Sequence, residues 1–330
     1  MKKVSIRDVA GEAGVSVTAV SHILNDNKQR FSQATIKKVL EAKERLGYIP
    51  NKNAQQLRGT KTKLIGVLLP SLTNPFFSTI MQSMDQHKPD DVEIIFLTTI
   101  NKGLEENIKH LVEHGVDGLV IGRFIDKPEN LNAYLNKHKV PYVVLDQSED
   151  NGFTDIIRTN EHEGGKSAAK HLIDYGHTNL AIIQPYELMA NMKDRISGFE
   201  EYCDACNISM PVKIDTELSK LGGRNAVGQI ISKKVTGIFA INDEIAIGAI
   251  RALIDKGITV PEDISIIGYD DIDFAKYMNP ALTTIAQPMD DIGKVALKLI
   301  IEKVEGLSSK TEKIELPTQI IVRETTQRLK

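Results

Sequence analysis

The chain has 330 residues, of which 41% are hydrophobic and 26% are charged, and its formal net charge is −3. This composition is typical of soluble globular proteins, and the length allows two or three domains of ~100–200 residues each. The sequence contains no apolar run of the ~18 residues that a membrane span needs, no hydrophobic secretory segment and only two cysteines. We therefore expect a cytoplasmic protein without membrane spans or a disulfide framework.

The charge is unevenly distributed along the chain. Residues 1–63 contain 13 Lys and Arg against 5 Asp and Glu, a net charge of +8, whereas the other 267 residues carry −11. A small basic segment on an acidic body indicates contact with a polyanion such as DNA. A solvated basic helix surface explains the same charge, so charge alone does not decide between the two.

Three short helices are predicted within the first fifty residues. Apolar residues at i, i+3, i+4 and i+7 from Ile6 predict a first helix, which Gly14 ends. Ser16 and Ser32 suit the N-caps of a second and a third helix, and Gly47 ends the third. The residues expected on the inner face of the third helix are Ile36, Val39, Leu40, Lys43 through its stem, and Leu46. A tight glycine turn between two helices is typical of a helix-turn-helix motif, and a generic three-helix bundle is the alternative.

The start of the second helix carries candidate base contacts. In a helix-turn-helix motif, the N-terminal residues of this helix reach base edges in the major groove. Val17 and Thr18 offer methyl groups to thymine, and Thr18 and His22 offer hydrogen bonds. The helix N-terminus at Ser16 favours a phosphate. The predicted DNA-binding residues of this segment are Ser5, Ser16, Val17, Thr18, Ser21, His22 and Asn25.

From Leu64 onward, short apolar runs alternate with segments of helical period. The runs, predicted to be buried strands, are 64–70, 92–99, 115–122, 141–146, 179–185, 236–243, 264–271 and 283–288. Buried strands separated by helices predict an α/β fold with doubly wound parallel sheets. This part is too long for one such sheet, so we expect two similar lobes.

Polar or aromatic side chains follow several of these strands. Ligands of open α/β sheets bind outside the carboxyl ends of the strands. The candidates at strand ends are Asn74, Phe76, Phe77, Asp146, Gln147, Asn242, Asp243, Asp270 and Gln287. Carboxylates and amides pair with hydroxyl groups, and aromatic rings cover sugar C–H surfaces. The set indicates a small, neutral, hydroxyl-rich ligand between two lobes, although each residue taken singly also fits a turn or a helix N-cap.

The segments SIRDVAGEAGVSVTAVSHILN (5–25) and RFSQATIKKVLEAKERLGYIPNKNAQQLRG (30–59) resemble the headpiece of the lactose/galactose repressor (LacI/GalR) family. The resemblance implies a homodimer that binds double-stranded operator DNA, with residues 15–25 as its recognition helix. It also implies that 53–58 form a hinge helix, in which Leu57 wedges into the minor groove and Ala54 lines the same face.

Residues 64–330 are similar to that family's effector core, which is itself like periplasmic sugar-binding proteins. LPSLTNPFF (69–77), FAINDEIAIGAIRAL (239–253) and IGYDDIDFAKYMNPALTTIAQP (267–288) resemble ribose repressors. The resemblance implies sugar contacts from Asn74, Phe76, Phe77, Asp146, Arg195, Asn242, Asp270 and Gln287. The chain departs from the pattern in two respects. Gln147 stands where ribose-binding proteins have arginine, and Leu218 and Leu221 stand where an aromatic residue is expected.

We predict a headpiece at 1–50, a hinge and linker at 51–63, and an effector and dimerisation core at 64–330. Within the core, the N-lobe is predicted at 64–159 with 288–314, and the C-lobe at 160–287 with 315–330. The predicted function is a non-enzymatic repressor of a sugar-utilisation operon. It needs no cofactor or metal, and a small sugar effector, with ribose, a pentose, as the first candidate, releases it from its operator.

Three alternatives stay open. The first is a catabolite-control regulator governed by a phosphocarrier protein, and the second is a sucrose or fructose operon repressor. The third is a sugar-binding or sugar-processing protein with a dispensable N-terminal bundle. The C-x-x-C at 203–206 lacks the second pair that a zinc site needs, and the H-x-x-E-H at 110–114 lies on a predicted surface helix, so we predict no metal at either.

Overall fold

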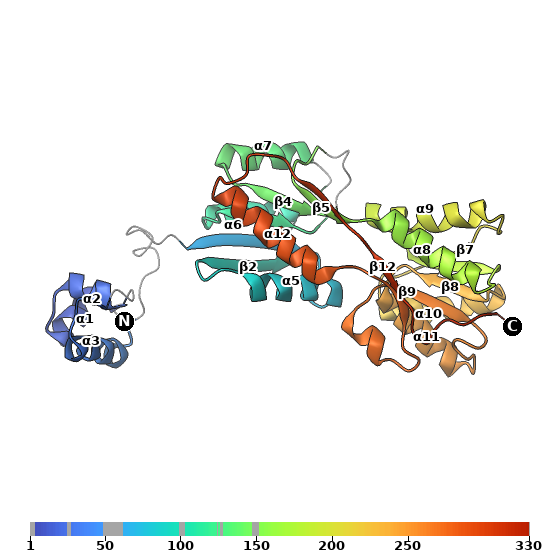
Figure 1. Ribbon diagram of the computed structural model, residues 1–330, viewed down its shortest axis with the longest axis horizontal. Helices are drawn as coiled ribbons and strands as arrows, with labels where there is room; N and C mark the ends of the chain where they lie inside the picture. The colour runs from blue at the N-terminus through green and yellow to red at the C-terminus, as the bar shows by residue number, and fades with distance from the viewer. Residues whose placement is uncertain are drawn as a thin grey trace. The chain divides into compact units, whose positions relative to one another are not determined.

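The chain folds as two compact units, Met1–Thr62 and Lys63–Lys330. The structure is a computed structural model that describes residues 4–24, 28–48, 62–98, 103–123, 125, 128–146 and 152–329. The described part of the first unit is helical, and the second unit contains two lobes, each built on one β-sheet (Figure 1). None of the helices in these ranges is long and apolar enough to cross a membrane.

The first unit has its own hydrophobic core. Its helices are α1 (Ile6–Ala13), α2 (Val17–Leu24) and α3 (Gln33–Leu46). Gly14 and Gly47 end α1 and α3 with φ angles of 66° and 61°, as predicted, because glycine adopts the left-handed conformation without strain. The expected burial of Leu40 is wrong. Its side chain is 38% exposed, because the inner face of α3 runs through Val39 and Ala42 instead.

The first lobe is a parallel sheet in the order β11-β5-β4-β3-β1-β2. Its strands are β1 (Lys63–Leu69), β2 (Val92–Thr98), β3 (Gly118–Ile121), β4 (Tyr142–Leu145), β5 (Ile156–Thr159) and β11 (Lys313–Leu316). Its helices are α5 (Pro75–His87), α6 (Leu104–Glu113), α7 (Pro128–His138) and α12 (Met289–Val304). Two separate clusters of buried side chains fill the space between the sheet and its helices. One packs α5 and α12 against one face, and the other packs α6 and α7 against the opposite face.

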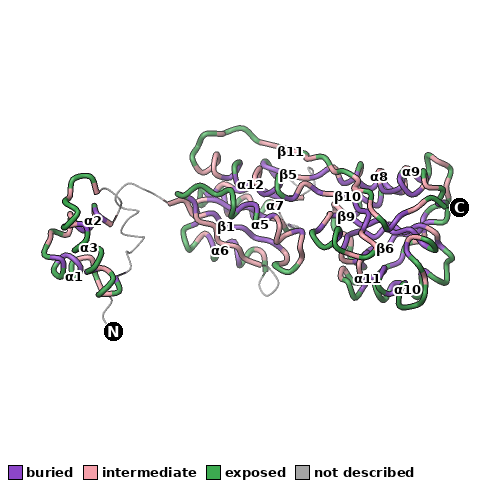
Figure 2. Tube along the Cα trace, turned by 60° about the horizontal axis from the view of Figure 1, so that its bottom comes forward, coloured by how far each residue is buried: buried purple, intermediate pink, exposed green. Residues whose placement is uncertain are grey.

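The second lobe repeats this architecture in the order β12-β10-β9-β8-β6-β7. Its strands are β6 (Leu180–Pro185), β7 (Val212–Thr216), β8 (Gly237–Ala240), β9 (Ser265–Asp270), β10 (Thr283–Ala286) and β12 (Gln319–Ile321), of which β12 pairs antiparallel to β10. Its helices are α8 (Glu161–Asp174), α9 (Ala190–Ala205), α10 (Lys220–Ser232), α11 (Asp243–Asp255) and the short η2 (Asp273–Tyr277). The central strands of both lobes form the buried interior, and the outer helix faces are exposed (Figure 2).

The eight predicted strands are all present, and β5, β7, β11 and β12 were not predicted. In β11, exposed residues alternate with half-buried ones, and in β7, exposed residues alternate with buried or half-buried ones. Their sequences therefore lack the continuous apolar run that marks a central strand. Lys63, predicted in the linker, is the first residue of β1. Its Nζ lies 2.6 Å from Asp91 Oδ2 and 2.7 Å from Glu305 Oε1.

Three connections join the lobes: β5 to α8, β10 to α12, and β11 to β12. The third runs from Leu316 to Gln319, two residues later than predicted. The first and third connections are hydrogen-bonded to each other. Asn160 N donates to Leu316 O at 3.0 Å, and Thr318 Oγ1 donates to Asn160 O at 3.5 Å. The lobes are therefore linked by adjacent backbone crossings.

Candidate functional site

A cleft of ≈ 520 Å³ lies between the two lobes. From the first lobe it is lined by Pro70, Ser71, Thr73, Asn74, Phe76, Phe77 and Asp146, and from the second by residues that include Asn191, Arg195, Leu218, Leu221, Asn242, Asp270 and Gln287. Every predicted effector residue that the structure describes lines this one cleft. The volume falls in the range of small-molecule sites, ~300–1,000 Å³.

Two asparagines each cap a helix at the cleft. Asn74 Oδ1 accepts a hydrogen bond from Phe76 N at 2.9 Å and so caps α5, and Asn242 Oδ1 accepts one from Ile245 N at 3.0 Å and caps α11. The capping geometry uses only the oxygen of each amide, so each Nδ2 stays available as a donor. The cap and the predicted ligand role are therefore compatible at both positions.

Two strand-end aspartates lie in the left-handed region of the backbone. Asp146 follows β4 with φ 53°, and Asp270 ends β9 with φ 114°. Aspartate tolerates this region better than most residues, but the conformation still costs free energy unless the surroundings hold it. At Asp270 the next turn is held by the buried Asp243, whose Oδ2 accepts from Ile272 N at 2.9 Å. The predicted strand-end candidate Asp243 thus supports the cleft without lining it.

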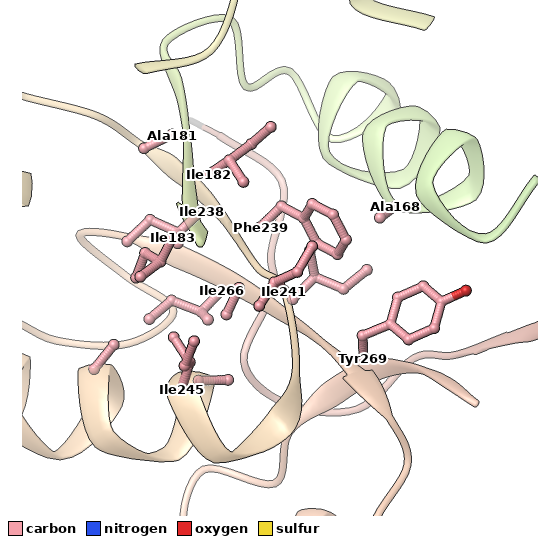
Figure 3. Close-up of a cluster of buried hydrophobic side chains, with 14 of the residues drawn as sticks. Ala168, Ala181, Ile182, Ile183, Ile238, Phe239, Ile241, Ile245, Ile266 and Tyr269 are labelled. Atoms are coloured by element: carbon pink, nitrogen blue, oxygen red, sulfur yellow. The ribbon is translucent and has the colours of Figure 1, made fainter. Parts of the chain in front are cut away.

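Arg195 on α9 lies in a buried polar cluster, with only 3% of its surface exposed. Its Nε lies 2.6 Å from Glu161 Oε2 and its Nη2 lies 3.1 Å from Glu161 Oε1. Nη1 donates to Ile241 O at 2.9 Å and lies 3.8 Å from Asp270 Oδ1. The guanidinium also lies 3.8 Å from the ring centre of Tyr269, which packs beside Phe239 on the side of the sheet that faces α8 (Figure 3). These contacts fix the guanidinium plane.

Gln287 joins this cluster from the crossing between β10 and α12. Its Nε2 donates to Asp270 Oδ1 at 2.7 Å, and its Oε1 lies 3.0 Å from Thr159 Oγ1. Thr159 Oγ1 in turn donates to Glu161 Oε1 at 2.8 Å. These contacts form a continuous path from Asp270 through Gln287 and Thr159 to the carboxylate that holds Arg195.

The cluster is rich in carboxylates. Burial, followed by repulsion from Glu161, raises the pKa of Asp146 to about 7. Burial also raises the pKa of Asp270 to about 7, opposed by the attraction of Arg195. For Arg195 itself, burial disfavours the charge, but attraction from Glu161 outweighs it and raises the pKa. Adding negative charge to this cleft is therefore unfavourable, whereas hydroxyl donors find several acceptors.

Sequence reasoning missed Thr159, Glu161, Asn191 and Tyr269. Thr159 and Glu161 flank the end of β5, a strand that was not predicted, so no strand-end signal marked them. Asn191 lines the cleft from the start of α9. Tyr269, at the end of β9, contributes its ring face to the guanidinium of Arg195.

Of the residues predicted to contact DNA, those that the structure describes lie on and before helix α2, the predicted recognition helix. Ser16 Oγ accepts from Ala19 N at 3.1 Å and so caps α2. Thr18 and His22 are exposed, and Val17 and Ser21 are half-buried. Ser5 is exposed and caps α1 by a reciprocal contact, in which its N donates to Asp8 Oδ2 at 2.8 Å. The exposed face of α2 thus carries hydrogen-bonding groups at Thr18, in its first turn, and at His22, in its last turn. Asn25, Ala54, Leu57 and Gln147 lie outside the described residues, and their roles stay predictions.

Both units of the chain are similar to known proteins. Residues 5–51 match the model of bacterial regulatory proteins of the lacI family, and residues 169–326 match a periplasmic binding protein-like domain. A transcriptional repressor of Aliivibrio fischeri strain MJ11, the HTH-type repressor PurR, is 35% identical over 97% of this chain and 97% of its own length. The chain belongs to the LacI family. It is a DNA-binding transcriptional repressor regulated by a small effector, and it is not an enzyme.

Solved structures of the LacI family share the fold. A LacI-family regulator of Enterococcus faecium with bound ribose has a TM-score of 0.76 and 36% identity, covering 81% of this chain and all of that one. A regulator of Enterococcus faecalis, also with bound ribose, has a TM-score of 0.75 and 38% identity over the same coverage. The lac repressor dimer bound to operator and an anti-inducer has a TM-score of 0.83 and 28% identity, covering 99% of this chain. The predicted fold class, a helix-turn-helix headpiece with two parallel α/β lobes, is confirmed.

Proposed function

We propose that this LacI-family repressor is a ribose-responsive homodimer that controls a sugar-utilisation operon in the cytoplasm. The observation that carries the proposal is the cleft of ≈ 520 Å³, in which Asp146, Arg195 and Asp270 lie together with side-chain amides and the aromatic pair Phe76 and Phe77. Carboxylates and amides pair with the hydroxyl groups of a sugar, and the T-shaped rings, with centres 5.0 Å apart, can cover its C–H surface.

The two Enterococcus regulators whose structures contain ribose support this choice of ligand, since each is more than a third identical to this chain. The curated relatives named PurR favour a second candidate, a purine effector. A flat purine ring would be expected to stack against an aromatic side chain from the second lobe. Leu218 and Leu221 stand in that part of the cleft instead, and since they also depart from the ribose-binding pattern they favour neither ligand. The proposal keeps ribose first because of the two regulators with bound ribose.

For DNA binding, we propose that Ser5, Ser16, Val17, Thr18, Ser21, His22 and Asn25 contact operator DNA from each headpiece, with Ala54 and Leu57 at the minor groove. Lysines and arginines then supply salt-dependent affinity through phosphate contacts, while α2 supplies sequence specificity. The predicted domain limits were 1–50, 51–63 and 64–330. The proposal keeps them except that Lys63, the first residue of β1, belongs to the core. Gln147 is proposed to complete the cleft beside Asp146.

Linkage makes the coupling between effector and operator reciprocal. If ribose favours a lobe arrangement that binds operator weakly, operator must weaken ribose binding by the same factor, typically equal to ~1–3 kcal/mol. We propose this induction model. Tighter operator binding in the presence of ribose would replace it with a co-repressor model.

A thermal-shift screen of the full-length protein tests the ligand. The panel contains ribose, other pentoses, fructose, sugar phosphates, guanine and hypoxanthine. A ligand at ~100 times its Kd adds about 2.7 kcal/mol of stability, which gives a clear shift. A shift with ribose supports the proposal, a shift with a purine alone supports the second candidate, and no shift with any compound favours control by a phosphocarrier protein.

A further inference from the structure

We propose that Thr159 is a positioning residue for the effector, joining Glu161, which holds Arg195, to Gln287, which holds Asp270, through one hydroxyl group. The inference rests on the proposed function, because it concerns the same site. Thr159 is buried and does not line the cleft, so it cannot act by touching the ligand. It acts through the two side chains that its hydroxyl contacts.

Those two contacts lead to Arg195 and Asp270, whose Nη1 and Oδ1 atoms lie 3.8 Å apart in the cleft. Thr159 Oγ1 lies 2.8 Å from Glu161 Oε1, and Glu161 holds Arg195 with both of its carboxylate oxygens. The same Oγ1 lies 3.0 Å from Gln287 Oε1, and Gln287 is bonded to Asp270 through both its side chain and its backbone. The hydroxyl is therefore the junction between the anchor of the arginine and the anchor of the aspartate.

The hydroxyl carries one proton, but two acceptor oxygens face it. While Gln287 Nε2 donates to Asp270, the Thr159 hydroxyl can donate its proton to Glu161 Oε1 or to Gln287 Oε1, but not to both. The oxygen that does not receive the proton then faces Thr159 Oγ1 without a hydrogen between them. If the amide of Gln287 turns by 180°, its Nε2 donates to Thr159 and the hydroxyl proton serves Glu161. Gln287 Oε1 then faces Asp270, and that contact needs a proton on the carboxyl. An effector hydroxyl that donates to ionised Asp270 favours the arrangement in which Gln287 Nε2 also donates to Asp270. The orientation of the Gln287 amide then decides whether the Thr159 proton is shared between Gln287 and Glu161 or belongs to Glu161 alone.

Thr159 also stands where the lobes are joined. It is the last residue of β5 in the first lobe, whereas Gln287 begins the crossing from β10 to α12. The residue after Thr159, Asn160, is bonded to the third crossing through Leu316 and Thr318. A change in the hydroxyl's partner thus occurs at the point where the relative position of the lobes is set.

The test compares three full-length variants by calorimetric titration with ribose and by thermal unfolding. Thr159→Val removes the hydroxyl at nearly constant volume, and Thr159→Ser restores it. The matched control is Thr325→Val. Thr325 is also fully buried, donates to Ile266 O at 2.7 Å and accepts from Thr283 N at 2.9 Å, but it lies outside the cluster around Arg195.

We expect Thr159→Val to weaken ribose binding about tenfold, which equals about 1.4 kcal/mol, and Thr159→Ser to stay within threefold of the wild type. Thr325→Val should lose comparable thermal stability and keep ribose affinity within twofold. The inference is overturned if the ribose affinity of Thr159→Val stays within twofold of the wild type. It is also overturned if Thr325→Val loses as much ribose affinity as Thr159→Val does. Should Thr159→Val not fold, Thr159→Cys, with its weak S–H donor, replaces it under the same criteria.

The wild type separates this inference from the proposed function. If the wild type binds a purine and not ribose, the ribose proposal fails, and the same variants are titrated with that purine under the same criteria. If the wild type binds no compound of the panel, a positioning role for Thr159 in effector binding fails as well.

Discussion

Arg195 and Glu161 form a bidentate ion pair in the interior of the second lobe, with Nε 2.6 Å from Oε2 and Nη2 3.1 Å from Oε1. Both side chains are at most 5% exposed. A guanidinium in this position is held in one plane, because its remaining faces and edges meet Tyr269, Ile241 and Asp270. The pair thus sets the orientation in which the arginine presents itself to the cleft.

Glu161→Gln removes one charge of this pair and keeps the volume of the side chain. We expect the free energy of unfolding to fall by about 3 kcal/mol, since a buried charge that loses its partner costs ~3–5 kcal/mol and Asp270 offsets part of the loss. Urea unfolding measures the change. Glu163→Gln, on the same helix in an exposed contact with Lys166, should change it by less than about 0.5 kcal/mol. A loss below about 1 kcal/mol for Glu161→Gln would contradict this account.

The carboxylates of the cleft predict discrimination against phosphorylated sugars. Asp146 and Asp270 already have pKa values raised to about 7, so a phosphate beside them would add repulsion and lose hydration. We expect ribose 5-phosphate to bind about 100-fold more weakly than ribose, as measured by calorimetric titration. Asp146→Asn should narrow that ratio. Equal affinity of the wild type for both compounds would show that the cleft does not repel anions.

Two buried histidines predict loss of stability in mild acid. Burial lowers the pKa of His171 and of His177, whose Nε2 atoms contact Thr326 Oγ1 at 2.8 Å and Gln327 O at 3.0 Å. The unfolded chain therefore binds more protons once the pH falls below about 6.5, so stability is present above that value and is lost below it.

The slope reaches at most about 1.4 kcal/mol per pH unit for each histidine. Urea unfolding between pH 7.5 and pH 5 measures it, and His177→Gln should reduce the slope because glutamine does not titrate. Exposed His138, replaced in the same way, serves as the control. An unchanged slope in His177→Gln would mean that other groups cause the acid sensitivity.

On the proposed recognition helix α2, Thr18→Ala should weaken operator binding by about 1–3 kcal/mol, because the exposed Thr18 is a proposed base contact outside the hydrophobic core of the headpiece. Ribose affinity should stay unchanged, since Thr18 belongs to the first unit and the cleft to the second. Fluorescence anisotropy with operator DNA at fixed salt measures the effect. Gly11→Ala on α1, where an added Cβ meets nothing within 4 Å, is the control and should bind as the wild type does. Wild-type operator affinity in Thr18→Ala would remove this residue from the interface.

Much of the fold was predictable because its signals are local. Gly14, Ser16 and Gly47 mark helix ends through backbone conformation and capping, and these preferences act within a few residues. The central strands appear as continuous apolar runs because both of their faces are buried. Leu40 was misplaced because neighbouring positions on a helix differ by about 100°, and only packing decides which of them turns inward.

The sequence by itself determined the headpiece, the two parallel lobes and the strand-end residues that line the cleft, since each follows from local periodicity or from the rule that strands end at one edge. Only the tertiary structure decided that Glu161, Thr159 and Gln287 connect Arg195 to Asp270. Thr159 and Gln287 lie 128 positions apart in the chain. Strand β5 has only four residues and ends in Arg158 and Thr159, so its sequence does not mark the residues at its end as part of a site. These residues are in contact because the crossings between the lobes bring distant parts of the chain together, and such a contact produces no pattern in the local sequence.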